Sequence, residues 1–265
     1  ALRLGNNEVT VTIIDSLFYG NRASHENGNG GGILALGTTP DVDLTIHNTT
    51  FSGNRSNDAG GGLKLIANAT ATITDSTFTG NTANFDGDGF EGGGGISTGS
   101  GFVTITNSIV AGNFVDGAST ATDLENSTYS SLGYNFIGDN TGAAAAFPAG
   151  NPNANDDYVG TGADPLDPLL DPLADNGGPT MSHLPDLAAS PVIDTGSCTG
   201  SVADQRGFGD PNTLVRIVDA PGVPAVDDGC DVGAVEAFAE AIAGPAIFAD
   251  GFESGDTASW SDTIP

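Results

Sequence analysis

The sequence has very few basic residues. Its 265 residues include six Lys and Arg against 34 Asp and Glu, which leaves a formal charge of −28 at pH 7. Proteins bind phosphate groups through basic side chains, so this balance argues against a nucleic-acid partner. A surface so acidic either attracts divalent cations and basic partners or is simply a well-solvated exterior.

Long apolar runs are also missing. No stretch approaches the roughly 20 apolar residues that a membrane-spanning helix needs, so we expect no transmembrane segment. The chain shows no signal peptide and reaches its first repeat at Val11, and we therefore expect that a presequence was removed or that more chain once preceded Ala1. Aromatic residues make up only 7%, whereas 40 glycines suit a fold with many tight corners.

The sequence does contain an eleven-residue repeat. Its four copies begin 33, 27 and 32 residues apart: VTIIDSLFYGN (11–21), LTIHNTTFSGN (44–54), ATITDSTFTGN (71–81) and VTITNSIVAGN (103–113). In each copy apolar residues alternate with polar ones, which is typical of a strand with one buried face. A repeat of this length predicts a fold built from stacked units.

Each copy continues with the same sequence of residue types. The alternation ends at a residue that favours a bend through local hydrogen bonding, followed by an apolar anchor and a closing Gly-Asn pair that tolerates positive φ. The bend residues are Asp15, Asn48, Asp75 and Asn107, and the anchors are Phe18, Phe51, Phe78 and Val110. A variable loop then leads to a glycine run, GGGI (30–33), GGGL (60–63) or GGGGI (92–96).

Three short extended segments per period, joined by bends, predict an all-β fold of the parallel β-solenoid (β-helix) type. One turn cannot bury its inward Ile and Phe alone, but stacked turns about 4.8 Å apart make them a continuous core. An antiparallel sandwich also has short strands and frequent turns. A sandwich, however, does not explain why the same eleven-residue pattern recurs along the chain.

The pattern divides the chain into three parts. Residues 1–140 form the turns, and 121–140 are a degenerate fifth copy in which FIGDN (136–140) replaces the usual ending. Residues 141–245 begin with an excursion (141–164) that we expect on the outside of the solenoid, and they continue as an irregular C-terminal cap region. Residues 246–265 form a separate tail.

The C-terminal part contains several short sequence motifs: LADNGGPT (173–180), SPVID (190–194), DQRG (204–207) and CDVGAVE (230–236). Together with DPLL (167–170), His183 and SLGYNFIGD (131–139), they resemble bacterial secreted β-helix proteins that carry a choice-of-anchor Q domain. The resemblance implies a right-handed parallel β-helix, exported and used in surface attachment or assembly, and it brings no enzyme activity. This chain departs from it by an insertion at 212–227 and by lacking the portion that usually precedes the helix.

The tail AIFADGFESGDTASWSDTIP (246–265) is similar to short C-terminal tails on exported proteins of some proteobacteria. Such a tail acts in sorting or assembly, with Phe248, Phe252 and Trp260 as its apolar residues. The alternative is a terminal strand anchored by Trp260.

Two cysteines, Cys198 and Cys230, are an even count in a chain that resembles exported proteins, which favours a disulfide between them. The three histidines have no metal-ligand spacing. We expect His47 to face solvent and His183 to orient a turn.

One loop has a weak metal signature. Asp86 and Asp88, with Glu91 close by, alternate oxygen ligands with glycine as a calcium loop does, but Asp-Gly pairs are also ordinary turn chemistry. Calcium is therefore the one candidate cofactor.

The enzymatic alternative is a polysaccharide lyase or hydrolase, because long β-helices present a groove along one face. Hydrolysis needs two carboxylates about 5–10 Å apart, which chance alone supplies in so acidic a chain. A lyase needs basic residues for an acidic sugar. Arg22 and Arg55 follow the Gly-Asn of successive copies, where they could stack as an anion site. The alternative is that they only reduce local repulsion in an acidic chain, since the next copies have Thr82 and Phe114 there.

The sequence thus predicts an exported surface protein without catalytic residues, acting in adhesion or self-assembly. An open first turn would accept a strand from a neighbour, giving a head-to-tail filament. The other non-enzymatic hypothesis is a monomeric adhesin that binds a glycan or a protein through its corner loops.

Overall fold

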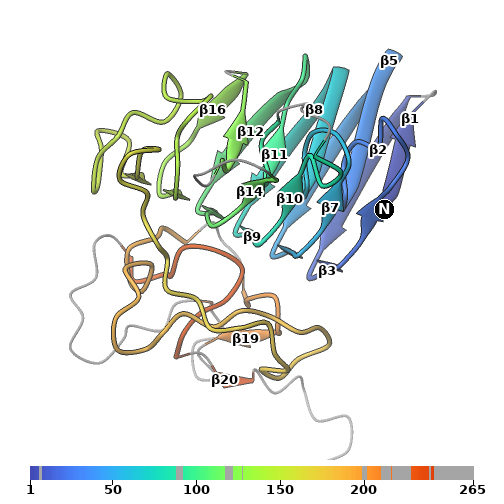
Figure 1. Ribbon diagram of the computed structural model, residues 1–265. Coiled ribbons are helices and arrows are strands. Elements are labelled where there is room, and N and C mark those ends of the chain that lie inside the picture. The colour runs from blue at the N-terminus through green and yellow to red at the C-terminus, as the bar shows by residue number, and fades with distance from the viewer. Residues whose placement is uncertain are drawn as a thin grey trace, which may run out of the picture.

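The computed structural model describes residues 1–5, 8–87, 92–116, 122–126, 128–198, 202–209, 216, 228–238 and 240–241. Within these ranges the chain is all-β, without a helix, and its parallel strands stack as a β-solenoid of about four turns (Figure 1). The predicted parallel β-helix is confirmed, while its right hand stays a prediction. No helix in the described part of the chain has the length and apolar character needed to cross a membrane.

The strands follow the repeat turn by turn. The first two turns contain β1 (Leu2–Gly5), β2 (Val9–Ile14), β3 (Leu17–Tyr19) and β4 (Arg22–Ala23), then β5 (Ile33–His47), β6 (Thr50–Ser52) and β7 (Arg55–Ser56). The next two contain β8 (Leu63–Thr74), β9 (Thr77–Thr79) and β10 (Thr82–Ala83), then β11 (Ile96–Ser97), β12 (Phe102–Thr106), β13 (Ile109–Val110) and β14 (Phe114–Val115). The degenerate copy forms β15 (Leu124–Glu125), β16 (Tyr129–Ser131) and β17 (Phe136–Ile137).

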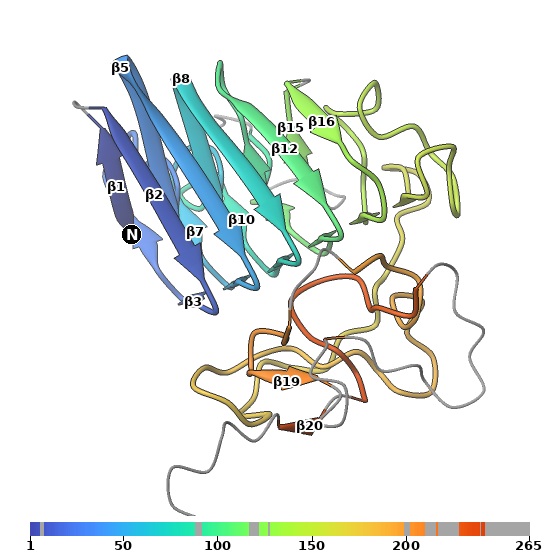
Figure 2. The same ribbon diagram turned by 180° about the vertical axis from the view of Figure 1, so that it is seen from behind.

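Corresponding strands pair in parallel and make the sides of the coil. The largest sheet joins β1, β5, β8, β11 and β15 with β2, β12 and β16, and Figure 2 shows its long strands side by side. A second sheet runs β3, β6, β9, β13, β17 and β18 (Tyr158–Val159), and a third runs β4, β7, β10 and β14. A short antiparallel pair, β19 (Phe208–Gly209) and β20 (Glu240–Ala241), lies outside the coil.

The inward side chains stack in register and form the core. Ile46 pairs with Ile73, which pairs with Ile105, and all three are at most 1% exposed. The rings of Phe51 and Phe78 are parallel, with centroids 4.3 Å apart. The predicted column of repeated Ile and Phe residues is therefore confirmed.

The Gly-Asn ending works differently from the prediction. Its glycines have positive φ, 62° to 69° at Gly20, Gly53, Gly80 and Gly112, but its asparagines do not. Instead, the backbone N–H and Nδ2 of each asparagine donate to Oδ1 of the corresponding residue in the next turn. This asparagine ladder runs Asn21, Asn54, Asn81, Asn113 and ends at Asp123.

The excursion at 141–164 was expected outside the solenoid, and this expectation is wrong for part of the segment. Phe147 is fully buried and Ala143 is 1% exposed, and both belong to the main core cluster. The Phe147 ring lies 5.9 Å from the ring of Tyr129 in β16. The segment therefore closes the last turn of the coil, because an uncovered turn would leave its apolar side chains in water.

The sequence predicted that the remaining C-terminal chain forms a cap region. In the structure its described part covers one side of the coil and does not close an end. The described parts of residues 164–241, hereafter the C-terminal layer, lie against the outer face of the second sheet (Figures 1 and 2). Val192 and Val232 of the layer pack on Ile109, Ala111 and Phe136 of that sheet. Strands β6 and β13 of the sheet are thereby buried on both faces, whereas Tyr19 of β3 is exposed.

Candidate functional site

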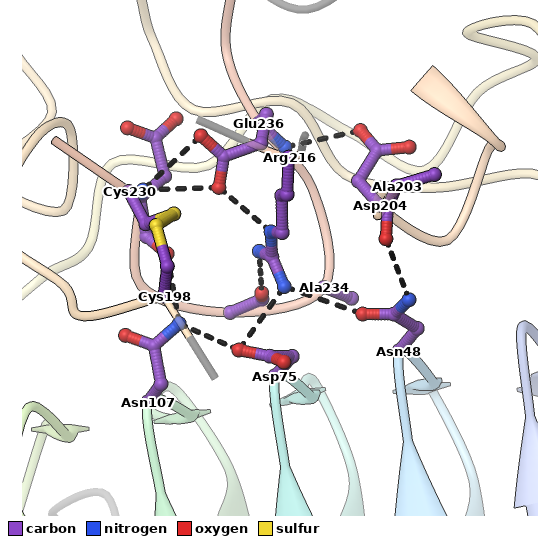
Figure 3. A network of polar contacts seen from close by, with 12 residues as sticks. Asn48, Asp75, Asn107, Cys198, Ala203, Asp204, Arg216, Cys230, Ala234 and Glu236 are labelled. Carbon is purple, nitrogen blue, oxygen red and sulfur yellow. Dashed lines mark hydrogen bonds and ion pairs between the residues drawn. A yellow bond between two sulfur atoms is a disulfide. The ribbon is translucent and has the colours of Figure 1, made fainter. Parts of the chain in front are cut away.

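A cluster of buried polar groups lies between the coil and the C-terminal layer (Figure 3). Its coil side consists of the predicted bend residues Asn48, Asp75 and Asn107, whose φ angles of 46°, 48° and 45° turn the chain between two sheets. The bends occur where the repeat predicted them. The side chains, however, reach across to the layer, far from their own position in the sequence.

Arg216 is the centre of this cluster. Its Nη1 lies 3.1 Å from Oδ1 of Asp75 and donates to Oδ1 of Asn48 at 3.2 Å, while its Nε donates to Oε1 of Glu236 at 2.8 Å (Figure 3). Its Nη2 also donates to the carbonyl of Gly233. The side chains of Arg216, Asp75 and Glu236 are fully buried, so the guanidinium joins two carboxylates away from water.

Further bonds extend the contact along the corner. Asn48 donates to the carbonyl of Ala203 at 2.9 Å, and Asn107 donates to Oδ1 of Asp75 at 2.7 Å and to the carbonyl of Asp231 at 3.1 Å (Figure 3). Burial raises the pKa of Asp231 to about 6, although its oxygens accept N–H bonds from the backbone. The bonds from Asn48 to Ala203 and from Asn107 to Asp231 hold the layer to the coil, and the others order the two sides of the contact.

His183 and Gln205 of the layer bind the next strand along. The Gln205 side chain bonds the hydroxyl of Thr50 at 2.6 Å, and Nε2 of His183 bonds the hydroxyl of Ser52 at 2.9 Å. Nδ1 of His183 lies 2.7 Å from the carbonyl of Asp171, and burial lowers the pKa of this ring. His183 therefore links two parts of the fold, beyond the predicted orientation of one turn. His47 is half-buried, with Nδ1 3.5 Å from Asp75, so it does not simply face solvent.

The predicted disulfide between Cys198 and Cys230 is confirmed, with a Cα–Cα distance of 5.4 Å. The carboxylate of Asp228 lies beside it and accepts the backbone N–H of Cys198. These three residues would resemble a metal-binding group, but both sulfur atoms are joined to each other. The disulfide therefore cross-links two segments of the layer, and neither cysteine has a thiolate that could bind a metal ion.

A pocket of about 210 Å³ lies beside the last turn, lined by Asp123, Asp167, two prolines, one leucine and two glycines. Asp123 is fully buried and accepts three N–H bonds, two from Asn113 and one from Asp139 at 2.8 Å. Burial raises its pKa to about 7, and the bonds from Asn113 oppose that rise only in part. Asp167 is exposed at the pocket and accepts the N–H of Leu169.

A third cluster joins three neighbouring turns. Nζ of Lys64 donates to the hydroxyl of Ser97 at 2.7 Å, and that hydroxyl donates to the carboxylate of Glu125. A serine beside an amine resembles a nucleophile beside its base. Ser97 is fully buried, however, so this chain of hydrogen bonds is another connection between turns.

Some of the remaining predicted site residues lie in the described part of the chain and others lie outside it. Arg22 and Arg55 are register partners on adjacent turns, as expected, and both guanidinium groups lie over the ring of Phe85. Asp86 is exposed in the turn after β10, whereas Asp88 and Glu91 lie outside the described residues, as do Phe248, Phe252 and Trp260. The calcium site and the tail thus stay predictions.

Sequence reasoning missed the acidic ends of the ladders and the role of Arg216. A second ladder of side chains that accept backbone N–H bonds passes through Thr49, Ser76, Ser108 and Asn135 and ends at the buried Asp157. The recurring Asn of Gly-Asn was a usable signal for the first ladder. Nothing local to Arg216 indicated its partners, since Asp75 is far away in the sequence.

Comparison with known proteins gives one short match. Residues 15–36, from the first bend into β5, match the repeat of the Chlamydia polymorphic membrane protein family. No curated protein and no solved structure matches the chain. The likeness concerns one repeat, and with the β-solenoid it fits a surface-exposed β-helix protein.

Proposed function

We propose that this chain is part of an exported bacterial surface protein that acts in adhesion, without turnover. One observation carries the proposal. In the part of the chain that the structure describes, the buried Asp123 joins two turns, the buried Arg216 joins the layer to Asp75 of the coil, and the buried Glu236 pairs with Arg216 inside the layer. These groups stabilise a scaffold, and of the four Asp123 alone also lines the pocket beside the last turn.

The outer face of the largest sheet suits adhesion. Thr12, Thr45, Thr72 and Thr104 are register partners on four successive turns and point away from the core. Their regular spacing of about 4.8 Å gives a flat, hydroxyl-rich surface. A surface of this kind can contact an extended glycan or protein over several turns at once.

A surface location is supported by two further observations. The matched repeat comes from a family named for a membrane protein. The disulfide between Cys198 and Cys230 favours an oxidising compartment outside the cytosol.

The filament hypothesis receives less support from the coil itself. Phe147 and Ala143 cover the last turn, so a neighbour's first turn would not meet an open core there. Assembly through the tail at 246–265 stays a proposal. Size-exclusion chromatography of the chain with and without residues 246–265, in calcium and in a chelator, tests both the tail and the cation.

The adhesion proposal is tested by binding and turnover measured together. The purified chain is applied to immobilised glycans and extracellular proteins, and soluble polysaccharides are incubated with it and assayed for reducing ends and unsaturated products. We expect saturable binding to at least one surface ligand and no new products. Product formation at a rate that follows protein concentration would contradict the proposal.

The enzymatic alternative is favoured by one feature, the pocket with Asp123 and Asp167. A carboxyl group that is protonated near neutral pH and an exposed carboxylate are the pair that glycoside hydrolysis uses. If products do appear, Asp167→Asn should abolish them, because Asp167 is the exposed member of the pair.

A further inference from the structure

Two arginines and one phenylalanine form a compact cluster on the third sheet. Arg22 begins β4 and Arg55 begins β7, and the two residues are register partners on adjacent turns. Their guanidinium carbons lie 4.5 Å and 4.6 Å from the ring centroid of Phe85, which follows β10. Side chains from three successive turns therefore meet at one ring.

The cluster is unusual for so acidic a chain. Like charges that face each other on neighbouring strands repel. Three of the four other basic residues, Lys64, Arg206 and Arg216, each have a carboxylate within ion-pair distance, and the fourth is the exposed Arg3 on the first turn. In the described part of the chain, neither Arg22 nor Arg55 has one, although Asp and Glu outnumber Lys and Arg 34 to six.

The geometry leaves both guanidinium groups able to bind an anion. Arg22 and Arg55 are exposed, and Phe85 is half-buried. A guanidinium whose face lies on an aromatic ring keeps its N–H donors in its own plane, where they are free to form a fork with a planar anion. A carboxylate matches that fork with two parallel hydrogen bonds.

We propose that Arg22, Arg55 and Phe85 bind the carboxylate of a terminal acidic sugar on an otherwise neutral glycan. This inference rests on the proposed adhesive function and names its ligand. A polyanionic chain is disfavoured because the net charge of −28 repels it as a whole. A neutral glycan that ends in a single carboxylate has one negative charge, and the two arginines bind that charge directly. The sugar ring packs on the exposed part of Phe85.

The test measures binding of the full chain to three oligosaccharides that differ in one group. The first ends in glucuronic acid, the second in its methyl ester, and the third in glucose. An acidic peptide serves as a fourth ligand. We expect the wild type to bind only the free acid, since the ester removes the charge and one acceptor of the bidentate pair.

Variants then assign the binding to the cluster. Arg22→Gln with Arg55→Gln is expected to weaken binding of the acid by about tenfold or more, the effect of losing one strong charge-assisted hydrogen bond or more. Arg22→Lys with Arg55→Lys keeps the charge but loses the fork, and an intermediate loss is expected. The control is Arg3→Gln, which removes one charge from another exposed arginine and should leave binding unchanged.

The outcomes separate this site from the broader proposal. If the chain binds a neutral glycan or a protein with an affinity that the double Gln variant does not change, adhesion holds and the arginine site is wrong. Equal binding of the free acid and the methyl ester, or preferential binding of the acidic peptide, would also overturn the site. A circular dichroism spectrum identical to wild type shows that the exposed substitutions leave the fold intact.

Discussion

Asn113 donates both its backbone N–H and its Nδ2 to a single oxygen of Asp123, at 2.8 Å in each case. An asparagine ladder needs a last residue whose oxygen accepts both N–H bonds of the preceding asparagine. A carboxyl group does this, and the second oxygen of Asp123 accepts the N–H of Asp139. An asparagine at position 123 would turn an NH₂ group toward one of these N–H donors.

This arrangement predicts a pH-dependent stability. Burial raises the pKa of Asp123 to about 7, above its unfolded value of 3.8, so the folded state holds this proton more tightly. The corresponding stability is fully present below about pH 4 and is lost as the pH rises through 7. Since one pKa unit is worth about 1.4 kcal/mol, the effect is on the order of 4 kcal/mol.

The measurement is urea unfolding of the wild type and Asp123→Asn at several values of pH between 4 and 8. We expect the variant to be less stable at pH 4 and the difference to shrink toward pH 8. Asp41→Asn, which changes an exposed carboxylate, is the control and should follow the wild type at every pH. A difference between wild type and Asp123→Asn that stays constant would show that Asp123 does not titrate in this range.

The middle of the ladder predicts a large effect of Asn81→Ala. Asn81 accepts two bonds from Asn54 and donates to Asn113 and to the carbonyl of Phe51. Its loss leaves buried donors and acceptors unpaired, at a cost of about 3 kcal/mol in free energy of unfolding. Asn68→Ala, at an exposed position, is the matched control and should change stability by no more than about 0.5 kcal/mol.

The closed end of the coil predicts the effect of Phe147→Ala. Phe147 is fully buried against Tyr129, so its removal should lower the free energy of unfolding by about 3–5 kcal/mol. Phe102→Ala removes a ring that is 45% exposed on the outer face of β12, and a much smaller loss is expected. Equal losses for the two variants would contradict the position of Phe147 inside the core.

Arg216 predicts how the layer is attached. Arg216→Met leaves the buried carboxylates of Asp75 and Glu236 without their cation, which should cost about 3–5 kcal/mol and expose the layer to proteolysis. Adding Asp75→Asn and Glu236→Gln removes the unpaired charges and should restore part of the stability. If the triple variant is no more stable than Arg216→Met, the loss comes from packing and not from charge.

Much of the coil could be predicted because the sequence pattern that determines it is local and is repeated in each turn. The alternation around Ile46, Ile73 and Ile105 fixes which side chains point inward, and the same order of residue types in each copy fixes the register. The glycines at Gly53 and Gly80 have the positive φ expected of them. Each of these features depends only on neighbours in the sequence and on the next copy of the repeat.

The rest depends on contacts that no repeat encodes. Asp75 looked like an ordinary bend residue because the sequence does not show that Arg216 binds it. Phe147 lies in an Ala-rich stretch without periodicity, so its place in the core could not be read from a pattern. Phe85 was missed for the same reason, since only the folded coil brings it to Arg22 and Arg55.

The stacking of successive repeats is tested most directly by nuclear Overhauser effects between isoleucine methyl groups, in protein labelled at Ile and assigned with single Ile→Val variants. We predict strong cross-peaks from Ile73 to both Ile46 and Ile105, its register partners on the adjacent turns about 4.8 Å away, and weak or no cross-peaks between Ile46 and Ile105. Absence of the cross-peaks from Ile73 would contradict the coil, and with it the ladders, the closed end and the arginine cluster.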